Sequence, residues 1–203
     1  MSANGRQTRC VQCAVVILEA TASRTGGVCM PCRNGERDRI DREKLDREKR
    51  RAFQKTPFAM YAQALMRRID EEPQAYLELS GAERSFYAVS ELFRRVGLDG
   101  WRWYFIVAGQ RYLHALEGLA ALGDVHAMET VCAAKLTIFG DAELSADEDE
   151  RFGTADSEAM ADERRQRTER ELAELERALL SDPGGVRSLD GPLDRYAQEH
   201  GLY

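Results

Sequence analysis

Residues 80–109 read SGAERSFYAVSELFRRVGLDGWRWYFIVAG, and their apolar side chains recur at steps of three and four residues. This spacing places the apolar side chains on one face of a helix that runs from about Ser80 to Val96. The members of the face are Phe86, Val89, Leu92, Phe93 and Val96. Gly97 is predicted to cap this helix, and a short apolar segment crowded with aromatic residues then follows at 101–109.

Helical patterns of the same kind extend on both sides of this stretch. FAMYAQALMRRIDEEP follows a threonine-proline start signal at Thr56 and ends at Pro73. RYLHALEGLAALG and DVHAMETVCAAKLTIFG form a helix pair, in which Asp124 is placed to cap the second helix. An acid-rich loop, a long helix and a short terminal helix complete the chain. No strand is predicted after residue 20, so we expect an all-α helical bundle over residues 56–203.

Four cysteines lie near the start of the chain, as CVQC (Cys10 and Cys13) and CMPC (Cys29 and Cys32). Four roles are possible for these cysteines: a pair of disulfides, a redox centre, a metal site, or no chemical role at all. No secretion signal is evident, so we expect a reducing cytoplasm, where disulfides are rare. No βαβ pattern surrounds either pair, which disfavours thioredoxin-like redox chemistry. Two Cys-x2-Cys pairs fifteen residues apart are typical of a closed four-thiolate site, so we predict one structural Zn²⁺.

The segment between the two cysteine pairs predicts the shape of this module. AVVILEA, at 14–20, favours a β-strand, and the SRTGG that soon follows is expected to return the chain as a hairpin. Gly27 and Gly35 are expected to relieve backbone strain beside the second pair. We therefore predict a zinc-ribbon-like module, a β-hairpin with zinc knuckles, over residues 1–35.

Charge divides the chain into two parts of opposite sign. Residues 1–55 carry 13 Lys and Arg against 7 Asp and Glu, whereas the whole chain has a formal net charge of −6. Most of the basic excess lies in residues 36–55, where opposite charges recur three or four positions apart, as in Asp38 with Arg42. The alternatives are a charged helical spacer and a basic arm for nucleic acid. The interleaved acids favour the spacer, so direct binding of nucleic acid is not expected.

The order of motifs over residues 56–203 resembles the bacterial DNA-mimic protein family, specifically its C-terminal-type helical domain. The resemblance is carried by the helix at 83–96, a glycine-bearing turn, an aromatic helix and the helix pair HALEGLAALGDVHAMETVCAA. Where that family often has an Asn-Gly-Gly turn, this chain has Leu98, Asp99 and Gly100. The resemblance implies an all-α domain whose surface carboxylates imitate DNA phosphates and occupy a DNA-binding protein.

Carboxylates gather in the acid-rich loop and in the first turns of the long helix. Duplex DNA presents one charge per about 1.7 Å of its axis, so a mimic needs its acids in rows and not merely in excess. The residues predicted to contact a basic partner are Asp147, Glu148, Asp149, Glu150, Asp156, Glu158, Asp162 and Glu163, together with Asp99, Trp101 and Arg102 at the aromatic turn. A solubilising surface without a partner is the alternative for these acids.

No catalytic function is predicted from the titratable residues. His126 and Glu129 have the i, i+3 spacing of metal-binding helical bundles, but a second matching set is missing. Cys132 lies in an apolar helix without an assignable base, which favours a packing role. No Gly-rich phosphate loop occurs in the sequence. We therefore expect a protein that binds without catalysing a reaction.

The partner expected from these observations is a basic protein, either a DNA-binding protein or a toxin. In the toxin case the chain would be an immunity protein. A further alternative is a nucleic-acid-associated regulator that uses the zinc module and the basic arm. No apolar run approaches the length of a membrane helix, so no membrane partner is expected, and a homodimer is left open.

Overall fold

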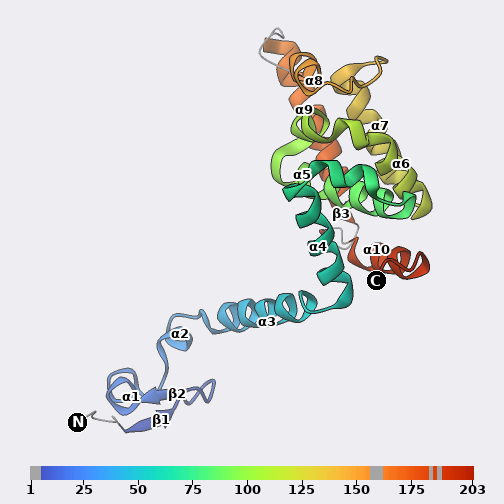
Figure 1. The fold of residues 1–203 in the computed structure, drawn as a ribbon. Coiled ribbons are helices and arrows are strands. Elements are labelled where there is room, and N and C mark those ends of the chain that lie inside the picture. The colour runs from blue at the N-terminus through green and yellow to red at the C-terminus, as the bar shows by residue number, and fades with distance from the viewer. Residues whose placement is uncertain (1–5, 156–161, 183–184, 187–188) are drawn as a thin grey trace. The chain divides into compact units, whose positions relative to one another are not determined.

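The computed structural model describes residues 6–155, 162–182, 185–186 and 189–203. The chain forms two compact units, Met1–Ala59 and Met60–Tyr203, and the second is called the helical unit below. Figure 1 follows the elements of both units in chain order. The predicted fold class is confirmed, because a small cysteine-bearing hairpin precedes an all-α body. The predicted boundaries at 35 and 55 stay a prediction.

The first unit begins with a two-stranded antiparallel hairpin of β1 (Gln7–Arg9) and β2 (Val16–Leu18). The hairpin encloses the first cysteine pair, and SRTGG does not form its turn. Instead, α1 (Glu19–Thr25) follows β2 directly, and Gly26 ends this helix in the left-handed conformation. The predicted hairpin position is therefore wrong. A strand after the first pair can reach β1 through a shorter loop, which costs less chain entropy.

Two further helices complete the first unit, α2 (Met30–Arg33) and α3 (Arg37–Phe53). No residue of α3 is buried, and ion pairs four positions apart lie along it. Arg37 Nε donates to Asp41 at 2.7 Å, and Arg39 Nη1 donates to Glu43 at 2.8 Å. Such exposed pairs stabilise a helix by only about 0.2–0.5 kcal/mol each. A helix that is exposed along its whole length is consistent with the spacer expected from the sequence.

The chain enters the helical unit through α4 (Pro57–Glu71). The start signal at Thr56 is confirmed, since the Ala59 N–H donates to Thr56 Oγ1 at 3.2 Å. Pro73 ends the helical pattern as predicted, and a 3-10 helix, η1 (Pro73–Glu78), follows. Ser80 then begins α5 (Gly81–Ala108) with a capping box, in which Ser80 and Glu83 satisfy each other's backbone N–H groups.

Helix α5 is the central element of the helical unit, and it bends at Gly100 and not at Gly97. Gly100 has φ 80° and ψ 175°, a conformation that side-chain-bearing residues avoid, whereas Gly97 stays helical. The predicted cap at Gly97 is therefore wrong. In the aromatic segment after the bend, Trp101, Tyr104 and Phe105 are all buried.

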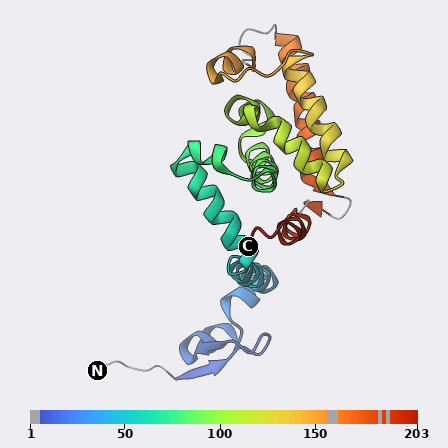
Figure 2. The same ribbon diagram turned by 45° about the vertical axis from the view of Figure 1, so that its right-hand side comes forward.

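The remaining elements pack around α5. They are η2 (Gly109–Arg111), α6 (Tyr112–Ala121), α7 (Val125–Phe139), α8 (Glu148–Ala155), α9 (Asp162–Leu180), β3 (Ser181–Asp182), β4 (Gly185–Val186) and α10 (Asp190–Glu199). The predicted cap of α7 is confirmed, because Asp124 Oδ1 accepts the Ala127 N–H at 3.0 Å. Helix α5 contacts α6, α8 and α9, and α7 lies beside α9 (Figure 2).

Two sequence expectations about the second half of the chain are wrong. The acid-rich loop contains a helix, α8, and a short antiparallel pair, β3 with β4, follows the long helix. Helix α8 has only eight residues, and most of them are polar or charged. Its sequence is therefore too short and too polar to show the apolar period of a helix. The β3–β4 pair is only two residues long per strand, which is below the length at which alternation can be seen in a sequence.

Gly118 marks the closest approach between α6 and α5. A methyl group added at Gly118 would lie 2.6 Å from Val89 Cγ2 and 2.9 Å from the Ser85 backbone oxygen. Because a backbone oxygen cannot turn aside, we expect Gly118→Ala to lower the free energy of unfolding by about 1–3 kcal/mol. Urea unfolding followed by tryptophan fluorescence measures this, since both tryptophans belong to the helical unit.

Gly153→Ala is the matched control for this prediction. Gly153 lies inside α8, and nothing would lie within 4 Å of its added methyl group. The replacement should leave stability unchanged or raise it by up to about 1 kcal/mol through helix propensity. A Gly118→Ala protein as stable as the wild type would show that α6 can move away from α5 at little cost.

Candidate functional site

Four cysteine thiols meet in the first unit. The Sγ atoms of Cys10, Cys13, Cys29 and Cys32 all lie within 4.8 Å of one another. Cys13 Sγ and Cys29 Sγ are 3.6 Å apart, close to the edge of about 3.8 Å that Zn–S bonds of about 2.3 Å imply for a tetrahedron of thiolates. All four are free thiols, so no disulfide competes for them. The donor set and its spacing fit a metal ion of tetrahedral preference.

The backbone around the cluster explains how the chain brings the two cysteine pairs together. The Val11 N–H donates to the Gly27 carbonyl oxygen at 3.0 Å, which ties the first knuckle to the second. The Cys29 N–H donates to Cys10 Sγ at 3.2 Å. Together with backbone hydrogen bonds from Cys13 and Gln12, this hydrogen bond lowers the pKa of the Cys10 thiol to about 6, which favours the thiolate that a metal ion requires. Gly27 has φ 82° and Gly35 φ 70°, as their predicted role in relieving strain requires.

The second candidate site is the acidic segment, residues 141–150, which contains six carboxylates and no Lys or Arg. Its last part forms the start of α8. Asp147 Oδ1 accepts the N–H groups of Asp149 at 2.8 Å and Glu150 at 3.1 Å, so Asp147 caps the helix. Ser145 Oγ donates to Glu150 Oε2 at 2.6 Å. Negative charge at a helix N-terminus is favoured by the helix dipole, which stabilises this concentration of acid.

Arg151 anchors the acidic segment to the body of the protein. Its side chain is only 2% exposed. Arg151 Nε donates to the carbonyl oxygens of Phe105 at 3.0 Å and Ile106 at 2.8 Å, at the end of α5. Arg151 Nη1 donates to the Ser145 carbonyl oxygen at 2.6 Å. Burial lowers the pKa of this guanidinium from its usual value. The backbone carbonyl groups near the C-terminus of α5 offset the cost of burying the cation, because the helix dipole is negative at that end.

Arg102 holds the other end of α8. It donates from Nη1 to the Ala155 carbonyl oxygen and from Nε to Glu169 Oε1 of α9 at 2.8 Å. With Arg151 at one end and Arg102 at the other, the acidic helix is bound to α5 at two points. Sequence reasoning missed Arg151; a single arginine directly after four acids was the available signal.

The other predicted contact residues have separate positions. Asp162 and Glu163 are exposed in the first turn of α9, and Asp162 Oδ1 accepts from Arg165 Nη2 at 2.6 Å. The start of α9 and α8 lie at the same end of the helical unit (Figures 1 and 2). Asp156 and Glu158 lie outside the described residues. Among the described acids, those of α8 and those of the first turn of α9 therefore belong to elements at the same end of the helical unit.

The aromatic turn offers less surface than the sequence suggested. Trp101 is 2% exposed and stacks on Phe105, with ring centroids 6.1 Å apart. A buried indole has no surface to offer a partner, so this part of the prediction is corrected: the outward tryptophan is Trp103, at 44% exposed. Asp99 is exposed beside Arg95, with Oδ2 and Nη1 4.0 Å apart. Arg102 is engaged within the fold as described above.

Cys132 stands apart from the other cysteines. It lies on α7, and Tyr112 Oη and Cys132 Sγ are 3.5 Å apart.

In the part of the chain that the structure describes, no helix is long and apolar enough to cross a membrane.

Comparison with known proteins gives one result that agrees with this architecture. No curated protein and no solved structure matches the chain. The family described as DMP19-like protein matches residues 77–200, which begin in η1 and end just after α10. The match spans more than half of the chain and includes the whole acidic segment, while the cysteine cluster lies outside it. The chain therefore belongs to the DMP19-like protein family, a family of DNA mimics that act by binding other proteins.

Proposed function

We propose that the chain is a non-catalytic binding protein whose acidic surface occupies the DNA-binding face of a basic protein. The contact surface consists of the acids at the start of α8, Asp147 to Glu150, and those in the first turn of α9, Asp162 and Glu163. Asp156 and Glu158 remain part of the proposal from sequence, with Asp99 and Arg102 at its edge. The partner is a DNA-binding protein.

The single observation that carries this proposal is the anchoring of the acidic helix by Arg151. A solubilising surface needs net charge but no fixed geometry. Here a buried arginine is held by three backbone carbonyl groups, Phe105, Ile106 and Ser145, and thereby sets the place of the carboxylates that follow Ser145. Carboxylates that keep their positions can match the regular charges of a DNA backbone, because binding then requires little reorganisation.

An immunity role toward a basic toxin would use the same surface and the same electrostatics. The two roles differ only in the identity of the partner, so the experiment below also separates them. For the nucleic-acid-associated regulator, acids are interleaved with the cations of α3, as Asp41 with Arg37 and Glu43 with Arg39, and we do not favour it.

We further propose that the four-cysteine cluster holds one structural Zn²⁺. The ligands are Cys10, Cys13, Cys29 and Cys32, and four thiolates leave no open position for a reacting group. The ion supplies cross-linking between the hairpin and α2 and takes no part in chemistry. Residues 1–35 then form a module of their own, separated by the charged helix α3 from the domain at 56–203.

Proteins from a bacterial lysate held on immobilised duplex DNA provide the test of the partner. The added chain should release its partner from the DNA, and mass spectrometry identifies the released protein. A variant with Asp147→Asn, Glu148→Gln, Asp149→Asn and Glu150→Gln should then bind this partner with an association rate at least about tenfold lower at low salt. Dissociation should change less, and added salt should reduce the difference.

The matched control removes four exposed carboxylates elsewhere, with Glu71→Gln, Glu72→Gln, Glu117→Gln and Glu129→Gln. Both variants lose the same net charge, so a local contact and a general charge effect give different results. If the control slows association as much as the α8 variant does, only net charge matters. If neither changes the rate, the contact surface lies elsewhere. Release of a toxin in place of a DNA-binding protein would favour the immunity role.

A further inference from the structure

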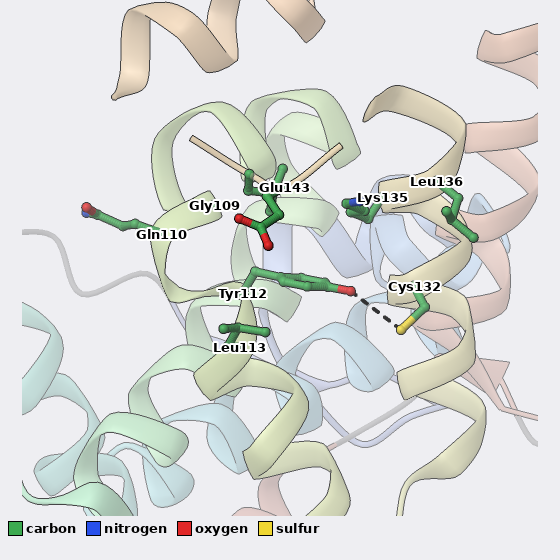
Figure 3. Close-up of a pocket in the computed structure, with 9 residues that line it drawn as sticks. Gly109, Gln110, Tyr112, Leu113, Cys132, Lys135, Leu136 and Glu143 are labelled. Carbon is green, nitrogen blue, oxygen red and sulfur yellow. Dashed lines mark hydrogen bonds between the residues drawn. The ribbon is translucent and has the colours of Figure 1, made fainter. Parts of the chain in front are cut away.

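A half-open pocket of about 530 Å³ lies beside the acidic segment. It is bounded by the start of α6, by one face of α7 and by the chain that leads into α8 (Figure 3). The residues that line it are Gly109, Gln110, Tyr112, Leu113, Cys132, Lys135, Leu136, Glu143 and Leu144. Its volume lies within the range of about 300–1,000 Å³ that is usual for binding pockets.

Two of the exposed side chains that line the pocket are leucines. Leu113 is 66% exposed and Leu136 is 52% exposed, from two different helices. Tyr112 also lines the pocket, and in Figure 3 its hydroxyl group points toward Cys132. Exposed leucine side chains that gather at one pocket are typical of a contact surface.

Two charged side chains define which group can enter. Lys135 lines the pocket, and its Nζ donates to the Gly140 carbonyl oxygen at 2.8 Å. A cation entering the pocket would meet this ammonium group, which disfavours a lysine or arginine as the occupant. The carboxylate of Glu143 points toward Tyr112 at the rim (Figure 3), where it disfavours an acidic occupant. An uncharged, apolar side chain is the group that both permit.

The surroundings of the pocket specify the rest of the partner. Glu143 and Leu144 belong to the acidic segment, whose ten residues carry six carboxylates and no Lys or Arg, so the pocket adjoins a strongly acidic stretch of chain. Protein interfaces commonly have this arrangement, in which a buried apolar anchor at the centre is surrounded by charged contacts that exclude water. Charge complementarity therefore selects a basic polypeptide around the anchor.

We infer that the basic partner inserts one apolar side chain into this pocket, while its neighbouring cations meet the carboxylates of the acidic segment. The inference rests on the proposed function and adds a specificity element to it. Carboxylates alone recognise any basic surface, whereas the pocket distinguishes basic segments that carry a correctly placed apolar residue from those that do not.

Two short peptides rich in arginine and lysine, which differ only in a central Phe or Ser, serve as probes. Fluorescence anisotropy measures their affinity for the full chain. The Phe peptide should bind about tenfold more tightly than the Ser peptide, as expected when an aromatic side chain is buried. Salt should weaken both peptides and leave most of the ratio, because the anchor contact is apolar.

A variant with Leu113→Gln and Leu136→Gln should reduce the Phe-to-Ser ratio to about one without changing the affinity for the Ser peptide. Both leucines are exposed, so the fold should tolerate the changes. Leu98→Gln, at an exposed leucine on α5 that does not line the pocket, is the control and should keep the ratio. Leucine methyl resonances of the wild type should shift at Leu113 and Leu136 when the Phe peptide is added.

The outcomes separate the two proposals. Equal, salt-sensitive affinity for both peptides, or a ratio that survives the double variant, overturns the pocket and leaves the acidic contact surface in place. Failure of both peptides to bind at low salt overturns the electrostatic contact as well. A ratio that disappears in the double variant and persists in Leu98→Gln supports the anchor pocket.

Discussion

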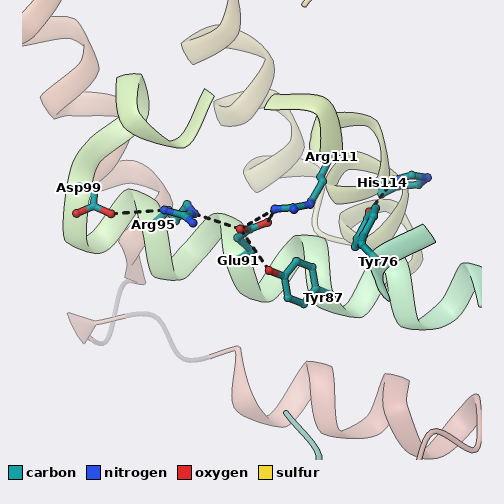
Figure 4. A network of polar contacts seen from close by, with 7 residues as sticks. All are labelled: Tyr76, Tyr87, Glu91, Arg95, Asp99, Arg111 and His114. Carbon is teal, nitrogen blue, oxygen red and sulfur yellow. Dashed lines mark hydrogen bonds and ion pairs between the residues drawn. The ribbon is translucent and has the colours of Figure 1, made fainter. Parts of the chain in front are cut away.

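Glu91→Ala is expected to lower the free energy of unfolding of the helical unit by about 3–5 kcal/mol, because it leaves a buried arginine without its counter-charge. Glu91 is 1% exposed, and both of its carboxylate oxygens accept from Arg111 Nη1, at 2.9 and 2.8 Å. Arg95 Nε also donates to Glu91 at 3.1 Å (Figure 4). The network joins α5 to η2 in the middle of the helical unit.

Aromatic rings enclose the same arginine. The guanidinium carbon of Arg111 lies 5.0 Å from the ring centroid of Tyr76 and 5.5 Å from that of Tyr87. Tyr76 Oη is in turn 2.7 Å from His114 Nδ1. Cation–π contacts with these rings stabilise the buried guanidinium, but they do not replace the negative charge of a lost carboxylate. Urea unfolding followed by tryptophan fluorescence measures the effect.

A double replacement is the control that separates the ion pair from the space it fills. Glu91→Leu with Arg111→Met removes both charges and keeps most of the volume. This protein should be far more stable than Glu91→Ala, and close to the wild type, because the buried charge of Arg111 is removed together with that of Glu91, and Arg95 keeps Asp99, with Nη1 and Oδ2 4.0 Å apart. A loss of less than about 1 kcal/mol in Glu91→Ala would contradict the prediction, since water would then reach Arg111 easily.

Metal removal is expected to unfold the cysteine-bearing module, residues 6–35, and to leave the helical unit folded. Within 6–35 the buried residues are Cys10 and Cys29 alone, so the module has no apolar core of its own. Structural zinc in small domains contributes about 10–16 kcal/mol at neutral pH, which is then the folding free energy of the module. Metal analysis of the reduced protein should find about one equivalent of zinc.

Two variants and one fragment test this second prediction further. Cys29→Ser should lose the metal and the dispersed amide resonances of residues 6–35, whereas Cys132→Ser, at the thiol on α7, should retain both. A fragment of residues 56–203 should keep a cooperative unfolding transition. Less than about a tenth of an equivalent of metal, with all thiols reduced, would exclude the four-thiolate site. Loss of cooperative unfolding in the fragment would exclude a separate module.

Local sequence signals identified much of this protein, because their physics acts over a few residues. The two Cys-x2-Cys pairs predicted the cluster, since each pair forms one knuckle whatever the rest of the chain does. Thr56 and Asp124 predicted helix starts, because a cap needs only the N–H groups that follow it. The order of helices between 56 and 203 was sufficient to predict both the fold class and the family.

Tertiary structure decided the features that depend on residues distant in sequence. Gly97 and Gly100 are alike as local signals, but in the fold only Gly100 leaves the helical conformation, with φ 80° and ψ 175°. Trp101 and Trp103 are two positions apart, and only the packing of Trp101 against Phe105 determines which of them is buried. The pocket at Leu113 and Leu136 joins two helices, so it has no counterpart in either segment alone.

Arg151 shows the division most clearly. In the sequence it is one arginine after a run of acids, where an exposed ion pair is the natural expectation. In the fold it is buried and bound to carbonyl groups of Phe105 and Ile106, more than forty positions earlier in the chain. The amount of acid can be counted in the sequence, and the period of apolar residues indicates most of the helices. The position of that acid on the surface depends on long-range hydrogen bonds, which no local pattern encodes.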